Sequence, residues 1–312
     1  MEFSIILAKQ VFTMFLLLLV GGILYKRNII RDEGAKQLTD MLLYLIMPFL
    51  ILDTYQIDYN PELTKNMLLG FLFSIFSIVI GILLSNWVKI KGKKEQITTE
   101  RFAIIFTNCG FMGIPLIEAV FGNMGVFYST TYLTIFNLMI WTYGLALMRG
   151  KQTGTRSLTE RIKPFCSPTM ICIALGIGMY FLRISFPEPV EKAVSYVASM
   201  NTPIAMIIAG INIVKSNLWS GLKRPRLYVT MLLKCFVVPL ATLVFLVFLP
   251  VDTTLRMTIL IASACPTAAN SIMFAGKYNG DEKVASHMFA LTTLCSIISI
   301  PAVIYIGTLV LK

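Results

Sequence analysis

The sequence has few charged residues, a single histidine and no long polar stretch. Only 14% of its 312 residues are charged, whereas 56% are hydrophobic. A soluble domain of this size needs far more polar surface. The hydrophobic residues also gather in runs of about 20, the length that a helix needs to cross a bilayer. The composition therefore predicts an all-α polytopic membrane protein surrounded by lipid.

Residue types that build metal sites and catalytic centres are also scarce. The six cysteines lie in or beside hydrophobic runs, no C-x-x-C pair occurs, and one histidine is too few for most metal sites. There is no H-E-x-x-H, and nearly all aspartates fall in loops. We therefore predict no catalytic residue, no metal and no cofactor beyond a coupling ion. An intramembrane enzyme is disfavoured, and the lack of a soluble signalling domain disfavours a receptor.

The net charge of +11 lies in the loops and not on one soluble face. This placement predicts no nucleic-acid partner and fits a cytoplasmic membrane surface. Most lysines and arginines fall in the first, third, fifth, seventh and ninth loops, which the positive-inside rule assigns to the cytoplasm. The first hydrophobic run lacks a basic lead-in and a small-residue cleavage site, so we expect a retained span. Both termini are then outside a cell (inner) membrane.

Ten hydrophobic segments are expected as spans: Phe3–Tyr25, Gln37–Tyr55, Met67–Ile90, Phe102–Phe121, Val126–Met148, Phe165–Phe186, Val190–Val214, Tyr228–Leu249, Thr254–Ala275 and Val284–Leu311. The longest loop divides them into five and five. Because five is odd, the second half enters the membrane with inverted topology. The sequence thus predicts two inverted repeats, residues 1–148 and 165–312, joined by a cytoplasmic loop at 149–164.

Prolines recur at matching places in the two halves. Pro48 in span two corresponds to Pro203 in span seven, and Pro115 in span four corresponds to Pro266 in span nine. Proline removes a backbone donor and clashes with the preceding turn, so each is expected to interrupt its helix. Simple proline kinks beside small packing residues are the alternative interpretation.

Spans four and nine carry the strongest signs of broken helices. Two glycines precede Pro115 within six positions, and small polar residues surround Pro266. Unwound backbone at membrane depth survives only where it is buried in protein or lines a cavity. Two such breaks would offer helix N-termini to an anion and carbonyl groups to a cation.

Three stretches also resemble one known family. The run from Asn108 to Gly122 resembles span four of the auxin efflux carrier family, which includes plant PIN-type carriers and bacterial organic-acid carriers. The stretch Pro266–Ala275, with Tyr278, Asn279 and Pro301, resembles spans nine and ten, and Asn201–Pro203 with Gly210 resembles span seven. The resemblance covers essentially the whole chain. It implies scaffold and crossover bundles, crossing helices four and nine, and a carboxylate site at the crossing.

The resemblance also implies roles for single residues. Asn108 would donate to the substrate carboxylate, and Pro115 and Pro266 would be the crossover prolines. Glu118 stands where plant carriers tend to have a basic residue, and the central loop is short, so a bacterial-type member is favoured over an auxin carrier. The full set of substrate-binding candidates is Asn108, Gly110, Met112, Gly113, Pro115, Pro266, Thr267, Asn270, Ser271, Asn201 and Thr202.

Ionisable residues within the spans are candidates for ion or proton coupling. They are Glu118, Asp40, Lys234 and His287, and each has a plainer interpretation. Lys234 snorkels or pairs with a carboxylate, and Asp40 caps a helix. Glu118 lies at the membrane surface, and His287 is an incidental interfacial residue. Lys9 in span one is expected to snorkel.

These observations predict a secondary transporter that moves a small organic anion, a carboxylate, by alternating access at the crossing of spans four and nine. An anion-conducting channel or leak pathway is the alternative, because prolines and small residues also suit pores. H⁺, Na⁺ or the membrane potential alone is left open as the driving force. A homodimer is left open as well.

Overall fold

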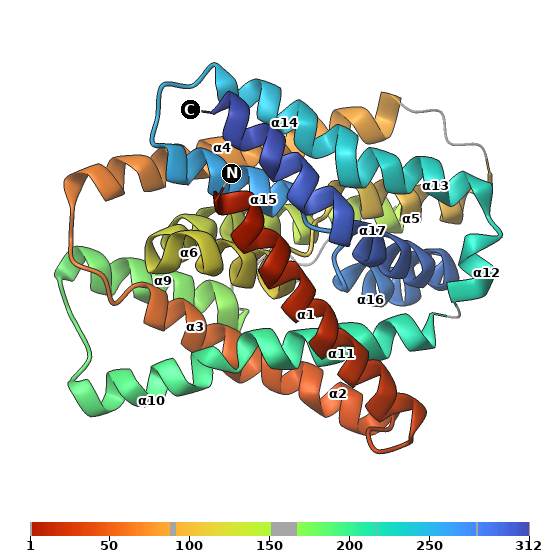
Figure 1. The fold of residues 1–312 in the computed structure, drawn as a ribbon, viewed down its shortest axis with the longest axis horizontal. Helices are drawn as coiled ribbons and strands as arrows, with labels where there is room; N and C mark the ends of the chain where they lie inside the picture. Colours follow the sequence, from red (N-terminus) through yellow and green to blue (C-terminus); the bar gives the residue numbers. More distant parts are fainter. Residues whose placement is uncertain (1, 88–91, 151–166, 217, 279, 312) are drawn as a thin grey trace.

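The structure is a computed structural model that describes residues 2–87, 92–150, 167–216, 218–278 and 280–311. The regular elements of these residues are all helical, with one isolated β-bridge and no longer strand among them (Figure 1). The helices and π-helical segments are α1 (Glu2–Lys26), α2 (Asp32–Met41), η1 (Leu42–Ile46), α3 (Met47–Thr54), α4 (Pro61–Trp87), α5 (Lys94–Ile105), η2 (Cys109–Gly113), α6 (Ile114–Met139), η3 (Ile140–Gly144), α7 (Leu145–Arg149), α9 (Pro168–Leu182), α10 (Glu188–Ser199), α11 (Asn201–Lys215), α12 (Leu218–Leu222), α13 (Pro225–Leu232), η5 (Leu233–Val237), α14 (Val238–Val247), α15 (Thr253–Ala264), α16 (Asn270–Lys277) and α17 (Glu282–Val310).

Within the described residues, seven helical stretches are long and apolar enough to cross a membrane: Ile5–Lys26, Asp32–Thr54, Pro61–Trp87, Cys109–Arg149, Glu188–Lys215, Pro225–Val247 and Glu282–Val310. The apolar helices α9 and α15 are shorter. The longest stretch is not one straight helix, because Gly122 takes φ 56° and ψ −152° inside α6. That backbone conformation suits glycine and separates α6 into two arms. The multi-pass, all-helical prediction is confirmed.

Two local expectations were wrong. The second segment begins at Asp32 and not at Gln37, since Asp32 and Glu33 occupy its first turn, where the helix dipole favours negative charge. Asp40 therefore lies late in α2 and is exposed, and it does not cap the helix. The short helix α12 was not expected, because five residues are too few to show in hydropathy.

Three of the π-helical segments share one cause. Each ends two residues before a proline: η1 before Pro48, η2 before Pro115 and η5 before Pro239. A proline has no N–H to donate and its ring crowds the carbonyl one turn earlier. A single wider turn relieves that conflict without ending the helix, and such turns are frequent at functional sites. In span seven the chain breaks instead at Met200, just before Pro203.

Helices α1 and α11 cross at close range through glycines (Figure 1). A Cβ atom added at Gly210 would overlap the carbonyl oxygen of Leu18, and one at Gly21 would overlap that of Ile207. Small residues allow helix backbones to approach closely in a bilayer, where packing and not water exclusion drives association. The two glycines therefore fix how α1 and α11 meet.

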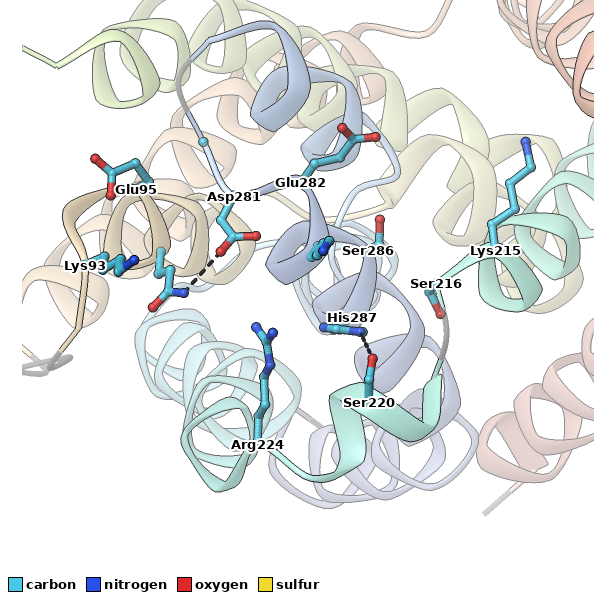
Figure 2. A pocket seen from close by; sticks show the side chains of 13 residues that line it. Lys93, Glu95, Lys215, Ser216, Ser220, Arg224, Asp281, Glu282, Ser286 and His287 are labelled. Atoms are coloured by element: carbon cyan, nitrogen blue, oxygen red, sulfur yellow. Dashed lines mark hydrogen bonds between the residues drawn. The ribbon is translucent and has the colours of Figure 1, made fainter.

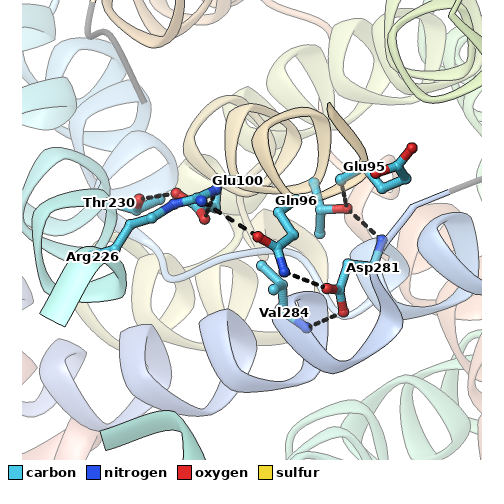
Figure 3. Close-up of polar contacts among 8 residues, drawn as sticks. Glu95, Gln96, Glu100, Arg226, Thr230, Asp281 and Val284 are labelled. Carbon is cyan, nitrogen blue, oxygen red and sulfur yellow. Dashed lines mark hydrogen bonds and ion pairs between the residues drawn. The ribbon is translucent and has the colours of Figure 1, made fainter. Parts of the chain in front are cut away.

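A chain of polar contacts ties α5 to α13 and to the start of α17 (Figure 3). The carboxylate of Glu100, 1% exposed, pairs with the Arg226 guanidinium at 2.5 Å and accepts a hydrogen bond of 2.8 Å from the Thr230 hydroxyl. Gln96 continues the chain, because its side chain accepts from Arg226 at 3.4 Å and donates to Asp281 at 3.1 Å. These contacts hold the three helix ends as one unit.

Removing the arginine should therefore destabilise the fold. We expect Arg226→Met to cost about 2–4 kcal/mol, because the Glu100 carboxylate is left buried without its cation. Combining Glu100→Gln with Arg226→Met should restore much of the lost stability, since no buried charge then remains at this pair. Thermal unfolding in detergent measures both effects. Lys192→Met is the control: Lys192 pairs with Glu188 at the exposed surface, where such pairs contribute less than about 1 kcal/mol. Equal losses at Arg226 and Lys192 would contradict the prediction.

Candidate functional site at the two helix breaks

The interruptions of two helical stretches meet in the interior. The first lies between α5, which ends at Ile105, and the segments η2 and α6, and the second lies between α15 and α16. Thr107 and Thr267 form an antiparallel β-bridge across them. The Asn108 N–H donates to the Pro266 carbonyl oxygen at 2.7 Å, and the Ala268 N–H donates to the Phe106 carbonyl oxygen at 3.0 Å. Each break thus provides hydrogen-bond partners for backbone groups of the other. Backbone groups inside a bilayer need such partners, because no water is there to replace them.

The place where the two breaks meet is called the junction. Side chains fix this junction to the surrounding helices. The Thr267 hydroxyl donates to the Ala103 carbonyl oxygen at 3.0 Å, which ties the second break to α5. The Thr267 N–H donates to the Thr292 hydroxyl of α17 at 3.1 Å. Thr267 and Thr292 are both fully buried. The position of the second break therefore depends on a hydroxyl supplied by α17.

Removing that hydroxyl should loosen the junction. We expect Thr292→Val to destabilise the protein by about 1–3 kcal/mol, because the Thr267 N–H is left buried without an acceptor. Thermal unfolding in detergent measures the loss. Thr308→Val is the matched control in the same helix, since the Thr308 hydroxyl donates to the carbonyl oxygen of Tyr305 within its own helix. A Thr292→Val midpoint as high as that of Thr308→Val would refute the role of this contact.

A small cavity lies against the two breaks. Its lining comes from η1, α3, both breaks, η2, the second arm of α6, α9 and α16. The residues are Leu43, Met47, Thr107, Asn108, Gly110, Phe111, Leu133, Phe136, Asn137, Thr169, Ala268, Ala269 and Asn270. Most of the wall is apolar, and a few polar groups converge on it, as in many small-molecule sites.

The ends of the half-helices give this cavity its electrostatic character. The segment η2 begins at Cys109, directly after Asn108, and α16 begins at Asn270. Helix N-termini present N–H groups that no intrahelical bond uses, together with a partial positive charge. Two such termini beside one cavity favour an anion there. The ends of α5 and α15 bring carbonyl groups to the same junction.

The cavity is small, with a volume of about 50 Å³. That is room for a few water molecules, each of which needs roughly 10–15 Å³ by this measure. A small organic anion needs more space than this. Binding of an organic anion in this cavity therefore requires its walls to move apart.

The predicted substrate-binding residues divide into two groups. Asn108, Gly110 and Asn270 line the cavity. The other candidates belong to the same breaks or to the start of α11 but do not line it: Met112, Gly113, Pro115, Pro266, Thr267, Ser271, Asn201 and Thr202. Asn201 is buried, 3% exposed. All of these assignments remain predictions.

Sequence reasoning missed several lining residues. Thr107 lies beside Asn108 in the break, and Met47 directly precedes Pro48. The two prolines that interrupt spans two and four were a usable signal, because the unwound or widened turns before them form the wall. Thr169 and Phe136 had no such signal, since their positions depend on how α9 and α6 pack.

The coupling candidates lie in different places. Glu118 is exposed on α6, within electrostatic reach of Asp53 at the end of α3. Lys234 is fully buried, so the snorkelling interpretation was wrong for it. Lys9 is exposed on α1, as a snorkelling side chain requires. Among the described residues, no three His, Cys, Asp or Glu side chains are grouped so as to hold a metal ion.

His287 packs inside the protein near the start of α17, a burial that the sequence did not predict. It is 3% exposed, and its Nε2 lies 2.8 Å from the Ser220 hydroxyl of α12 (Figure 2). It borders a second cavity of about 940 Å³ between the ends of α5, α11, α12 and α17. Lys93, Lys215, Arg224 and Lys283 line this cavity together with Glu95, Asp281 and Glu282. Side chains of both charge signs are therefore mixed in this lining.

Broken helices that meet beside a small cavity, within a multi-pass helical protein, are typical of membrane transport proteins. The family model described as membrane transport protein matches residues 6–164 and 157–304. The chain belongs to this family, which is of the auxin efflux carrier type. The resemblance found in spans four, seven, nine and ten is thereby confirmed.

Relatives in three microorganisms cover most of the chain. It is 22% identical over 296 residues to an uncharacterised transporter of Methanocaldococcus jannaschii, with 91% of this chain and 93% of that protein covered. It is 24% identical over 306 residues to an uncharacterised transporter of Methanothermobacter thermautotrophicus, covering 94% and 96%. It is 20% identical over 288 residues, covering 88% and 87%, to a Rhizobium meliloti protein named "Putative malonate transporter".

Proposed function

We propose that this protein is a secondary transporter of a small carboxylate, which it binds at the junction of the two helix breaks and carries by alternating access. The observation that supports this most is the cavity beside Asn108, where the N-termini of η2 and α16 converge. An anion is favoured there by N–H donors and by the dipoles of both half-helices. The name of the Rhizobium meliloti relative makes malonate the first substrate to test.

The proposed architecture has ten spans in two inverted five-span repeats, with spans four and nine crossing at the β-bridge. Span four is α5 with η2 and the first arm of α6, and span nine is α15 with α16. The half-helices on either side of each break support this arrangement, because alternating-access carriers place substrate between discontinuous helices at the repeat interface. A cell-membrane location with both termini outside follows from the basic loops.

The proposed transport cycle begins from the small cavity beside the two breaks. The cavity wall combines Leu43 of η1, Met47 of α3 and Thr169 of α9 with residues of the breaks. The polar network around Glu100 holds α5, α13 and α17 together. We assign the breaks with α5, α13 and α17 to one moving bundle, and α1 and α11 to the scaffold. Rocking of one bundle against the other opens the cavity to each side in turn.

Counterflow in proteoliposomes tests this function. Vesicles loaded with unlabelled malonate should accumulate labelled malonate transiently, because a carrier exchanges substrate across the membrane one molecule at a time. Initial rates should saturate with concentration. Succinate, acetate and leucine in the same vesicles define the substrate class, and vesicles without protein set the background. If no carboxylate gives counterflow, a carboxylate carrier is refuted.

The same vesicles separate a carrier from an anion channel or leak pathway. A channel passes malonate down its gradient without counterflow, and its flux rises with concentration without saturating. The broken helices around the cavity are the arrangement that alternating-access carriers use. We therefore expect saturable counterflow and no steady conductance in planar bilayers.

A further inference from the structure

Lys234 is a buried cationic residue that the transport site described above does not use. It lies in η5 and its side chain is 0% exposed. Its Nζ has no hydrogen-bond partner within the described part of the chain, and none of the ion pairs described there includes it. A charged group in such a place is expensive in a bilayer and commonly has a function.

The local helix explains why the side chain points inward. The segment η5 is the wide turn that Pro239 imposes two residues after Val237. One turn earlier, Thr230 is held by the buried Glu100 carboxylate. The helix is therefore fixed in rotation on the side that faces α5, and η5 contacts α5, α15 and α17. Lys234 cannot swing to the membrane surface without breaking this packing.

The Lys234 side chain ends beside the junction of the two breaks. Its ammonium group lies within electrostatic reach of the thiols of Cys109 and Cys265. These cysteines flank the junction, because Cys109 follows Asn108 and Cys265 precedes Pro266. They also lie close together, since a Cβ atom added at Gly113 would be 3.2 Å from the sulfur of Cys265 and 3.6 Å from the Cβ of Cys109.

The same junction is where a broken-helix carrier would be expected to hold a cation. The carbonyl ends of α5 and α15 meet there, and the C-termini of helices carry a partial negative charge. Carbonyls freed by unwound helices commonly coordinate sodium. In this chain the Lys234 ammonium group lies within electrostatic reach of the thiols beside both breaks. The cavity lining includes Asn108 and Gly110 but neither the two cysteines nor Lys234. The Lys234 charge would therefore act on an anion in the cavity across the junction and not by direct contact.

We propose that Lys234 is a tethered cation that takes the place of a sodium ion at the junction and balances the charge of the carboxylate bound in the cavity. The proposal rests on the proposed carboxylate carrier. It makes two statements about the chain: sodium neither binds to the junction nor drives transport, and the ammonium group contributes to anion affinity. It therefore excludes one of the coupling ions that the sequence left open.

Sodium binding tests the first statement without any transport assay. The purified protein is unfolded thermally in detergent over a series of sodium chloride concentrations, with choline chloride keeping the ionic strength constant. We expect the same midpoint at every sodium concentration, because the ammonium group occupies the position of the ion. A saturable rise of the midpoint with sodium, absent with choline, would overturn the proposal, since ligands that bind the folded state stabilise it.

Carboxylate affinity tests the second statement. In Lys234→Met vesicles the KM for malonate should rise about tenfold or more, the effect expected for one unit charge at roughly 10 Å in a protein of effective dielectric about 20. Methionine fills a similar volume and removes a buried charge, a change that folds commonly tolerate. Lys234→Gln is the second neutral variant, and Lys234→Arg should keep an affinity near that of the unmodified protein. Lys9→Met is the matched control, because Lys9 is a lysine within a span that is exposed.

The outcomes separate the two proposals. Wild-type counterflow that is equal in sodium and choline, with a raised KM in both neutral Lys234 variants, supports the tethered cation. Counterflow that requires sodium, or an unchanged KM in folded Lys234→Met and Lys234→Gln, overturns it while leaving the carboxylate carrier intact. If the wild type carries no carboxylate, the transport proposal fails, and the sodium titration alone decides whether an ion binds at the junction.

Discussion

Replacing Asn108 by alanine should lower the kcat/KM for malonate counterflow about 10- to 100-fold. A hydrogen bond to a charged group contributes roughly 1.5–3 kcal/mol, and each 1.4 kcal/mol is tenfold in an equilibrium constant. The fold should survive, because the contacts of Asn108 with Pro266 and η2 use its backbone and not its carboxamide. Initial rates in proteoliposomes, normalised to the amount of folded protein, measure the loss.

Two further variants test the direction of the effect on malonate transport and provide a control. Asn108→Asp keeps the shape but replaces the amide donors with a negative charge, so it should reduce malonate transport more than alanine does. Asn137→Ala is the control within the same cavity, because the Asn137 amide already donates to the Leu133 carbonyl oxygen of its own helix at 2.8 Å. If Asn108→Ala transports malonate as well as the unmodified protein does, the assignment of the site is wrong.

Replacing Gly210 by alanine should have the largest effect on stability, with a loss of about 3 kcal/mol or more. The new methyl group would meet the Leu18 carbonyl oxygen and other backbone atoms of α1, and a backbone cannot rotate away as a side chain can. The α1–α11 contact must then open, and its van der Waals packing is lost along both helices. Thermal unfolding in detergent, followed by circular dichroism, measures the change.

Gly178→Ala is the matched control for this prediction. Gly178 is also helical, in α9, but a Cβ atom there would meet no atom within 4 Å. Alanine has the higher helix propensity, so this variant should be neutral or stabilised by up to about 1 kcal/mol. If the two variants unfold at the same temperature, close packing at Gly210 is not what holds α1 against α11.

Much of the local structure could be read from the sequence. The hydrophobic runs gave helix positions to within a few residues for most segments, because bilayer thickness sets their length. Pro48 and Pro115 marked widened turns and Pro266 a break, since a proline has no N–H to donate to the preceding turn. The start of α2 was missed because its first turn is polar, and hydropathy does not register such a turn.

The buried site was harder to predict than the helices. In a soluble protein the apolar face of a helix shows which side is buried. In a membrane both the lipid-facing and the protein-facing sides are apolar, so the pattern does not distinguish them. For this reason Lys234 was left between snorkelling and pairing, and the burial of both Lys234 and His287 in the protein was not predicted.

The amino-acid sequence by itself determined the environment, the helical class, the positions of the breaks and the family of this protein. These properties follow from composition, run length and proline chemistry, which act within one or two turns of the chain. Only the tertiary structure decided that Thr107 and Thr267 pair across the two breaks and that Lys234 reaches the same junction. Both depend on contacts between segments more than a hundred residues apart, and no local pattern encodes which segments will meet.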